Sequence, residues 1–267
     1  MLKDITLGQY FPGDTPVHRL DPRTKLIAVI IYIVALFQAS SWLSYGVVAV
    51  FVISVMVISH ISLKNIFSGL KPMLIIITLT ALLNIFYTEG TPVREGWIVT
   101  YEGIDKSLKM ILRIVLLICG TFLLTYTTSP ISLTDGLERL LSPLKKLKVP
   151  VHELTMMMSM ALRFIPSLIE ETDKIMSAQK ARGADFETGS LINRAKALIP
   201  ILVPLFVSSF KRADDLAVAM ECRCYNGGEG RTRMKVLRME ARDYIAFAVC
   251  VALLAVIILI KIYWKHI

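Results

Sequence analysis

Two arginines, Arg182 and Arg223, each lie between small residues at the end of a long predicted helix. A guanidinium group is planar and carries five N–H donors, so it can bind carboxylates or carbonyl oxygens inside a groove. Small neighbours let the backbone of a partner come close to the helix end. The candidate coupling residues are Ala181, Arg182, Gly183, Cys222, Arg223 and Cys224. Their chemistry predicts two cationic docking points.

The two arginines belong to a repeat with an offset of 41 residues. The segment AQKARGAD occupies 178–185 and AMECRCYN occupies 219–226, and the same offset pairs Asp173 with Asp214. One arginine near a helix end is commonly explained by attraction to the helix dipole, with Gly183 following the helix. Two copies on consecutive helices favour a partner with two similar grooves, such as a dimeric ATPase. We expect the two helix ends to lie side by side.

Residue patterns of enzymes and metal sites are missing from the sequence. The glycine-rich stretch 227–232 lacks the G-x-x-x-x-G-K-[ST] pattern of a phosphate-binding loop, and His152-Glu153 does not continue to H-E-x-x-H. Cys222 and Cys224 are too close in sequence for the usual zinc pair. Cys119 and Cys250 lie in apolar runs and are expected to pack as small hydrophobic residues. We therefore predict neither a catalytic nor a metal site.

The composition is that of a membrane protein: 55% of the residues are hydrophobic and 19% are charged, against ~25% charged in soluble domains. Long apolar runs are typical of transmembrane helices. The predicted spans are 24–38, 42–60, 72–88, 108–128 and 244–262. Arg113 lies within the fourth, where it either reaches the outer surface or faces the bundle interior. A short basic loop is expected around Lys64 and Lys71, and an outer loop over 89–107.

The segment 129–242 is polar and rich in predicted helix. It holds 18 Lys and Arg against 13 Asp and Glu, and we expect helices over 132–147, 151–182 and 190–224. The net charge of +9 then reflects basic cytoplasmic segments next to anionic lipid rather than nucleic-acid binding. The positive-inside rule places the N-terminus and this segment in the cytoplasm.

The predicted fold is an all-α integral membrane protein with about five transmembrane helices. A cytoplasmic or interfacial coupling domain of about three helices completes it, including the two long arginine-tipped helices. The expected divisions are 1–128 for the N-terminal segment and the first four spans, 129–242 for the coupling domain and 243–267 for the final span.

At these motifs the sequence resembles a known family. AQKARGAD and AMECRCYNGGEGRTRMK are similar to the paired Ala-Arg-Gly signatures of the transmembrane (T) component of energy-coupling factor (ECF) vitamin transporters, a group of ABC-type importers. LDPRTK at 20–25 resembles the segment before that family's first span. The resemblance covers essentially the whole chain. It departs at the second signature, where Cys222 and Cys224 replace Ala and Gly.

The resemblance implies a non-catalytic scaffold in a bacterial cell membrane. Two ABC ATPase subunits, of A and A′ type, would bind the arginine tips, and a membrane-embedded substrate-binding S component would contact the rest. ATP-driven motion would pass through Arg182 and Arg223 to the S component and release a vitamin or other micronutrient. ATP and Mg would be bound by the ATPases, and this chain would hold no cofactor. An integral membrane enzyme and a stand-alone secondary transporter remain the alternatives.

A methionine-rich stretch and two prolines are candidates for the S-component contact. Flexible Met-rich surfaces accept several different partners, although plain helix packing also explains methionines here. The candidate residues are Met156, Met157, Met160, Pro200 and Pro204.

Overall fold

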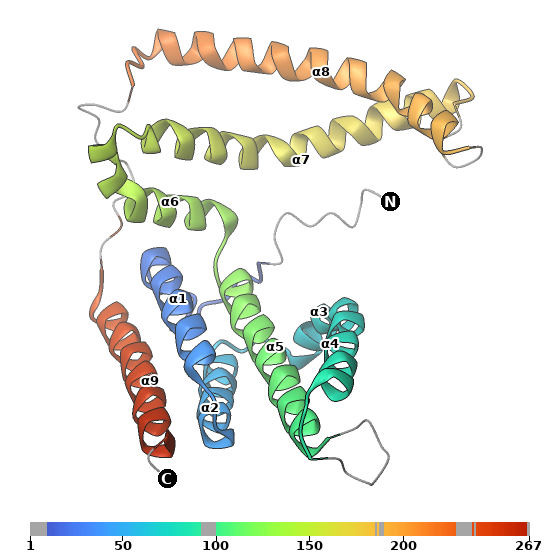
Figure 1. Ribbon diagram of the computed structural model, residues 1–267. Helices are drawn as coiled ribbons and strands as arrows, with labels where there is room; N and C mark the ends of the chain where they lie inside the picture. The colour runs from blue at the N-terminus through green and yellow to red at the C-terminus, as the bar shows by residue number, and fades with distance from the viewer. Residues whose placement is uncertain are drawn as a thin grey trace. The chain divides into compact units, whose positions relative to one another are not determined.

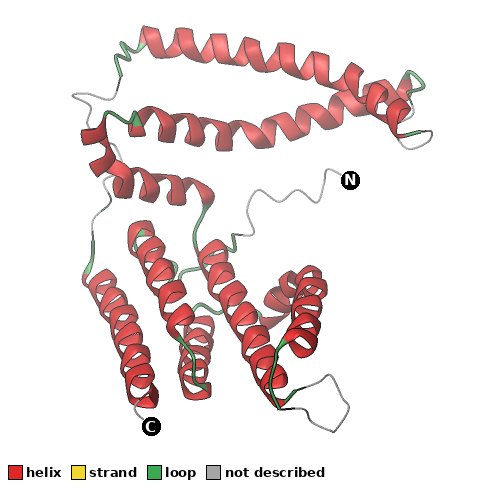
Figure 2. Ribbon diagram, viewed as in Figure 1, coloured by secondary structure: helices red, strands yellow, loops and turns green. Residues whose placement is uncertain are grey.

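The computed structural model describes residues 10–91, 100–184, 186, 190–227, 237 and 239–265. All secondary-structure elements within these ranges are helices, and no strand occurs there (Figure 2). Contacts divide the chain into two compact units. Among the described residues, one is a helical bundle within 10–140 and 237–265, and the other lies within 141–227. The all-helical fold class is confirmed.

The bundle is built from helices at both ends of the chain (Figure 1). Its elements are α1 (Pro22–Gln38), α2 (Trp42–Ile58), α3 (Leu63–Leu70), the 3-10 turn η2 (Lys71–Met73), α4 (Leu74–Tyr87), α5 (Tyr101–Thr127), α6 (Pro130–Leu141, up to Leu140) and α9 (Ala241–Lys265). The C-terminal α9 packs mainly on α1, and α5 contacts α1, α2 and α4. α5 therefore links the two sides of the bundle.

Close approach of α1 and α5 forms the centre of the bundle core. Tyr32 on α1 is buried, and its hydroxyl donates to the carbonyl of Leu116 on α5 at 2.6 Å. A Cβ atom at Gly120 would lie 2.3 Å from the Tyr32 ring, so glycine leaves the space that the ring fills. Arg113 donates to the Tyr45 hydroxyl and to the Ala39 carbonyl. This charge therefore faces the bundle interior and ties the α1–α2 connection to α5.

Within the part of the chain that the structure describes, three stretches are long and apolar enough to cross a membrane by length and composition: Lys64–Tyr87, Tyr101–Thr127 and Ala241–Tyr263. α2 is a shorter apolar helix of 17 residues. Large hydrophobic side chains such as Val57, Ile75 and Leu259 are more than 60% exposed, as expected for helix faces that contact lipid. These findings support a location in the membrane, while the expected number of five spans stays a prediction.

Two predicted loops are wrong in part. The basic stretch with Lys64 and Lys71 is helical, because α3 and η2 lead directly into α4. The expected outer loop over 89–107 ends by Thr100, since the Thr100 side chain accepts a hydrogen bond from the Gly103 amide and caps α5 at its start. In each case charged residues occupy helical turns next to an apolar run. Residues 92–99 lie outside the described part.

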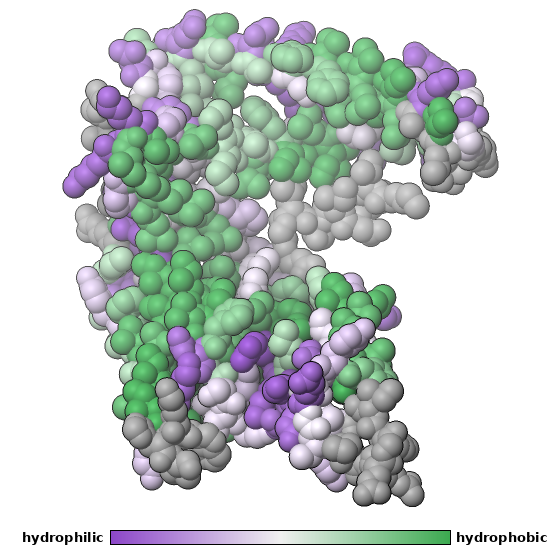
Figure 3. All heavy atoms as spheres, in the orientation of Figure 1, coloured by the Kyte–Doolittle hydropathy of each residue, from purple (hydrophilic) through white to green (hydrophobic). Residues whose placement is uncertain are grey.

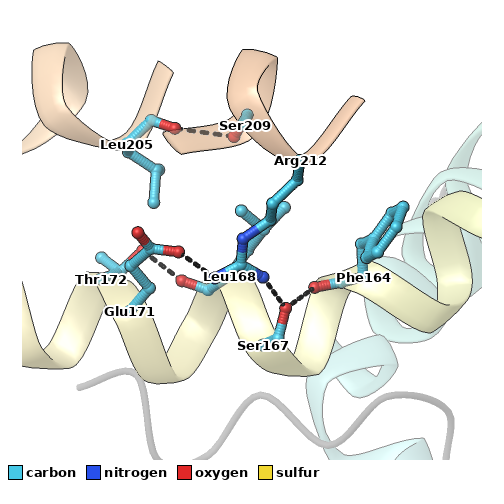
Figure 4. Close-up of polar contacts among 8 residues, drawn as sticks. All are labelled: Phe164, Ser167, Leu168, Glu171, Thr172, Leu205, Ser209 and Arg212. Carbon is cyan, nitrogen blue, oxygen red and sulfur yellow. Dashed lines mark hydrogen bonds and ion pairs between the residues drawn. The ribbon is translucent and has the colours of Figure 1, made fainter. Parts of the chain in front are cut away.

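The second unit is a helical hairpin. It contains the 3-10 segment η3 (Ser142–Leu147), α7 (Val151–Ala181, 31 residues) and α8 (Leu191–Cys222, 32 residues). α7 and α8 pack side by side and run in opposite directions (Figures 1 and 4). At 1.5 Å per residue, each helix is about 46–48 Å long. Both helices continue through internal prolines, Pro166 in α7 and Pro200 and Pro204 in α8.

Candidate functional site

The first candidate docking point is the C-terminal end of α7. Arg182 is the residue that caps the helix, and Gly183 follows with a φ of 87°. The Gly183 amide donates to the Lys180 carbonyl and the Ala184 amide donates to the Gln179 carbonyl, both at 3.0 Å. This pair of bonds is the Schellman motif, which needs a left-handed residue after the cap. Glycine adopts that conformation at little cost.

The second docking point, at the end of α8, has the same geometry. Arg223 caps the helix, and Cys224 follows with a φ of 54°. The Cys224 amide donates to the Glu221 carbonyl at 2.8 Å, and the Tyr225 amide donates to the Met220 carbonyl at 3.0 Å. Each of these residues is 41 positions after its counterpart at the first end. The sequence repeat is therefore also a repeat of backbone structure.

All six candidate coupling residues are exposed in the chain. Neither guanidinium group is buried in the protein's own core, so both are accessible to a partner. Their placement differs from the expected side-by-side arrangement. Because α7 and α8 are antiparallel, Arg182 and Arg223 lie at opposite ends of the hairpin (Figure 1).

A polar clasp, made of Arg212, Glu171 and Ser167, joins the two helices near the middle of the hairpin. Arg212 on α8 points toward α7, where it forms an ion pair with Glu171 and donates to the Ser167 hydroxyl (Figure 4). Ser167 in turn donates to the Phe164 carbonyl at 3.1 Å. The Arg212 and Glu171 side chains are 35% and 23% exposed, which makes the pair half-buried. The sequence analysis did not identify this cluster.

The candidate S-component residues do not form one patch. Met156, Met157 and Met160 lie in the first third of α7, and Pro200 and Pro204 lie in the first half of α8. In an antiparallel hairpin these two groups fall on opposite sides of the clasp. Met157, Pro200 and Pro204 are exposed, whereas Met156 and Met160 are half-buried.

An exposed apolar stripe runs along α8, within the uncharged run 197–210 that predicts a buried or interface-lying helix. Its side chains recur every three or four residues, which is the spacing of one helix face. The stripe consists of Leu198, Ile199, Leu202, Val203, Phe206, Val207 and Phe210, each at least 46% exposed. Figure 3 shows hydrophobic residues over much of the visible hairpin. The uncharged run itself is too short to span a membrane.

The LDPRTK segment forms a polar junction within the bundle. Asp21 caps α1 by accepting from the Arg23 amide at 2.9 Å, and its own amide donates to Asp243 of α9 at 2.8 Å. Lys25 donates to the carbonyls of Thr127, at the end of α5, and His18. The segment therefore joins the start of α1 to α5 and α9, which is a structural role.

The surroundings of this junction affect one titratable group outside the helices. Partial burial lowers the pKa of His18 from its ordinary value, although a hydrogen bond to the Phe11 carbonyl at 3.1 Å opposes the shift. Among the described residues, no group of three or more His, Cys, Asp or Glu side chains is placed to hold a metal ion. The four cysteines are unpaired, with Cys119 and Cys250 buried and Cys222 and Cys224 exposed.

Comparison with known proteins gives a consistent match over most of the chain. The CbiQ family, described as "Cobalt transport protein", matches residues 13–234. The chain is 54% identical to the energy-coupling factor transporter transmembrane protein EcfT of Clostridium kluyveri, covering 99% of both chains. It is 55% identical to EcfT of Thermosediminibacter oceani, covering 96% of this chain and 97% of the relative. Identity to EcfT of Bacillus subtilis is 47%, over 98% and 100% of the two chains.

Proposed function

The chain belongs to the family of energy-coupling factor transporter transmembrane proteins, and from this we propose that it is the non-catalytic scaffold of an ECF-type importer. In this role it couples two ATPase subunits, of A and A′ type, to a membrane-embedded S component that binds a vitamin or other micronutrient. ATP and Mg are bound by the ATPases. The chain crosses a bacterial cell membrane several times, with its N-terminus and the hairpin in the cytoplasm.

One observation carries this proposal: two exposed arginines cap two antiparallel helices through the same hydrogen-bond pattern. A pair of equivalent cationic ends fits a partner with two equivalent acidic or carbonyl-lined grooves, which a dimer of related ATPases offers. The small residues Ala181, Gly183, Cys222 and Cys224 leave room for the groove walls at each end. Buried arginine contacts at an interface are worth about 2–5 kcal/mol when one partner is removed.

Charge reversal tests the proposal. We expect Arg182→Glu and Arg223→Glu each to reduce co-purification of the ATPases and uptake in reconstituted vesicles, and the double variant to reduce both further. Arg163→Glu is the matched control, because Arg163 is also an exposed arginine of α7 but lies 19 residues before the tip. Wild-type co-purification and uptake by the double variant would contradict the proposal.

The apolar stripe of α8 supports the second half of the proposal. A continuous exposed apolar surface marks a site of protein or membrane contact, and an S component embedded in the membrane offers a matching apolar face. The stripe shares its stretch of α8 with two of the candidate residues, Pro200 and Pro204, which are also exposed. We expect Val207→Asp with Phe210→Asp to reduce S-component co-purification while ATPase co-purification is retained. Ser177→Asp, at an exposed polar position of α7, serves as the control.

The same experiments separate this function from its alternatives. A scaffold transports nothing by itself, so vesicles that contain only this chain should show no uptake. Uptake by the isolated chain would favour a stand-alone secondary transporter, and substrate turnover by the isolated chain would favour a membrane enzyme.

A further inference from the structure

The 41-residue offset between the helix ends also relates the two helices of the hairpin to each other in length and position along the chain. The same offset maps α7, 151–181, onto 192–222, which is nearly all of α8. It also maps Glu171 onto Arg212 and Ser167 onto Ser208. In an antiparallel pair, the residue numbers rise along one helix and fall along the other. Residues that are 41 apart therefore face each other at one place along the two helices. The ion pair of Glu171 with Arg212 marks that place, so a pseudo-two-fold axis passes through the clasp.

The charges at this axis differ between the two copies of the repeat. Glu170 and Glu171 of α7 correspond to Lys211 and Arg212 of α8. Identical charges facing each other across an axis would repel, whereas opposite charges attract. The guanidinium group of Arg212 donates to both Glu171 and Ser167. Two hydrogen bonds from one planar group restrict both the distance between the helices and their rotation against each other.

The clasp lies at equal distances from the two helix ends. Arg182 follows Glu171 by 11 residues and Arg223 follows Arg212 by 11 residues, which is about 16 Å along each helix. We call the segments between the clasp and the two tips, 172–182 of α7 and 213–223 of α8, the arms. Because the helices are antiparallel, the two arms point away from each other on either side of the clasp. Any rotation of α7 against α8 at the clasp therefore displaces both arginine tips by similar amounts.

We propose that the clasp is the pivot of the hairpin and that Arg212 is a positioning residue, which holds Arg182 and Arg223 at a defined separation. Pro166 lies directly before Ser167 and has no amide to continue the hydrogen bonds of α7, so that helix has a weak point beside the pivot. The role of the tips as ATPase contacts rests on the proposed function. The pivot itself needs no partner subunit, because all of its contacts are made within this chain.

Distance measurement between the two arms tests the pivot directly. Spin labels are placed at Ser177→Cys and Val218→Cys, which are exposed counterparts in the repeat, in a chain with Cys222→Ser and Cys224→Ser. Pulsed electron resonance on the purified full chain should give one narrow distance distribution. Arg212→Ala should widen or shift it by on the order of 5 Å, about one helical turn. Lys211→Ala, at the adjacent exposed residue, is the control.

Reversing the pair separates a specific contact from general loss of folding. We expect Glu171→Arg combined with Arg212→Glu to restore the narrow distribution, while either change alone does not. An unchanged distribution in Arg212→Ala, or failure of the double reversal to restore it in a chain with normal helix content, would overturn the pivot. These results do not depend on any ATPase.

A second measurement links the pivot to transport. In reconstituted vesicles with ATPases and S component, Arg212→Ala should lower uptake several-fold, and the charge swap should recover it. Normal uptake together with a widened distribution would overturn the positioning role. Failure of the proposed function gives a different result, because ATPase co-purification would then survive reversal of both tip arginines while the clasp variants still changed the distance.

Discussion

The least favourable backbone position among the coupling residues is Cys224. Its φ of 54° is left-handed, a conformation that costs a residue with a Cβ atom about 1–2 kcal/mol. Gly183 occupies the same position at the first helix end with no such cost. We expect Cys224→Gly to strengthen the end of α8 by about 1 kcal/mol. Hydrogen exchange should show roughly five-fold greater protection of the Tyr225 amide, which closes the motif.

The reciprocal change at the first end provides the comparison. Gly183→Ala places a Cβ on a residue with a φ of 87°, although nothing lies within 4 Å of that atom. The change should therefore weaken protection of the Ala184 amide through backbone strain alone. If the Tyr225 amide in Cys224→Gly and the Ala184 amide in Gly183→Ala were protected as in the wild type, the left-handed conformation would not limit the stability of either helix end.

Asp243 is a buried carboxylate that satisfies two backbone amides. Its two oxygens accept from Asp21 and Glu240, each at 2.8 Å, and the residue is 4% exposed. Asp243→Ala would leave both donors without this acceptor, at a cost of about 1–3 kcal/mol each. We expect a clear fall in the melting temperature of the purified chain, with Asp243→Asn intermediate. Asp14→Ala removes a side chain that is 93% exposed and should leave the melting temperature unchanged.

At the scale of elements, the contact of α1 with α5 depends on the absence of a side chain at Gly120. An added Cβ would lie 2.3 Å from the Tyr32 ring, whose hydroxyl is held by the Leu116 carbonyl. Overpacking of this kind costs about 1–3 kcal/mol, so Gly120→Ala should lower the melting temperature. Gly46→Ala in α2 is the matched control, because nothing lies within 4 Å of its added Cβ. Better helix propensity should make that variant equal to or more stable than the wild type.

Several element boundaries could be predicted from local sequence alone. Asp21 before Pro22 starts α1, and proline or polar residues limit α7 and α8. The predicted ends of these three helices agree with the observed ones to within two residues. Apolar composition was a poorer guide where charged residues occur in helical turns. The helical turns at Lys64 and those after Thr100 were predicted as loops for this reason.

The arrangement of the candidate site was only partly predictable. The repeat identified both arginine tips, because a Schellman end leaves a local signature of small residues. Arg182 and Arg223 lie at opposite ends of the hairpin because a short connection joins two long antiparallel helices. A comparison of the two tip motifs alone does not take this connection into account. The clasp depends on a contact between residues 41 apart in sequence. Opposite charges at matched repeat positions, Glu171 and Arg212, were its available signal.

At the scale of the whole molecule, the proposed orientation can be tested with the chain's own cysteines. Cys222 and Cys224 are exposed beside the second arginine tip, whereas Cys119 and Cys250 are buried in the bundle. If the hairpin is cytoplasmic, a membrane-impermeant maleimide should label Cys222 and Cys224 only in inside-out vesicles of cells that express the chain without its partners. The buried Cys119 and Cys250 should stay unlabelled in either orientation.

An outer-side reporter completes the test. Glu89 is an exposed residue that follows α4, and five spans with a cytoplasmic N-terminus place it on the opposite side from the hairpin. In a chain with Cys222→Ser and Cys224→Ser, Glu89→Cys should therefore be labelled in intact cells. The two labels should report opposite sides, because the candidate membrane span Tyr101–Thr127 lies between them, followed by α6, α7 and α8. Labelling of Cys222 in intact cells would place the arginine tips outside, where no ATP-hydrolysing partner could drive them.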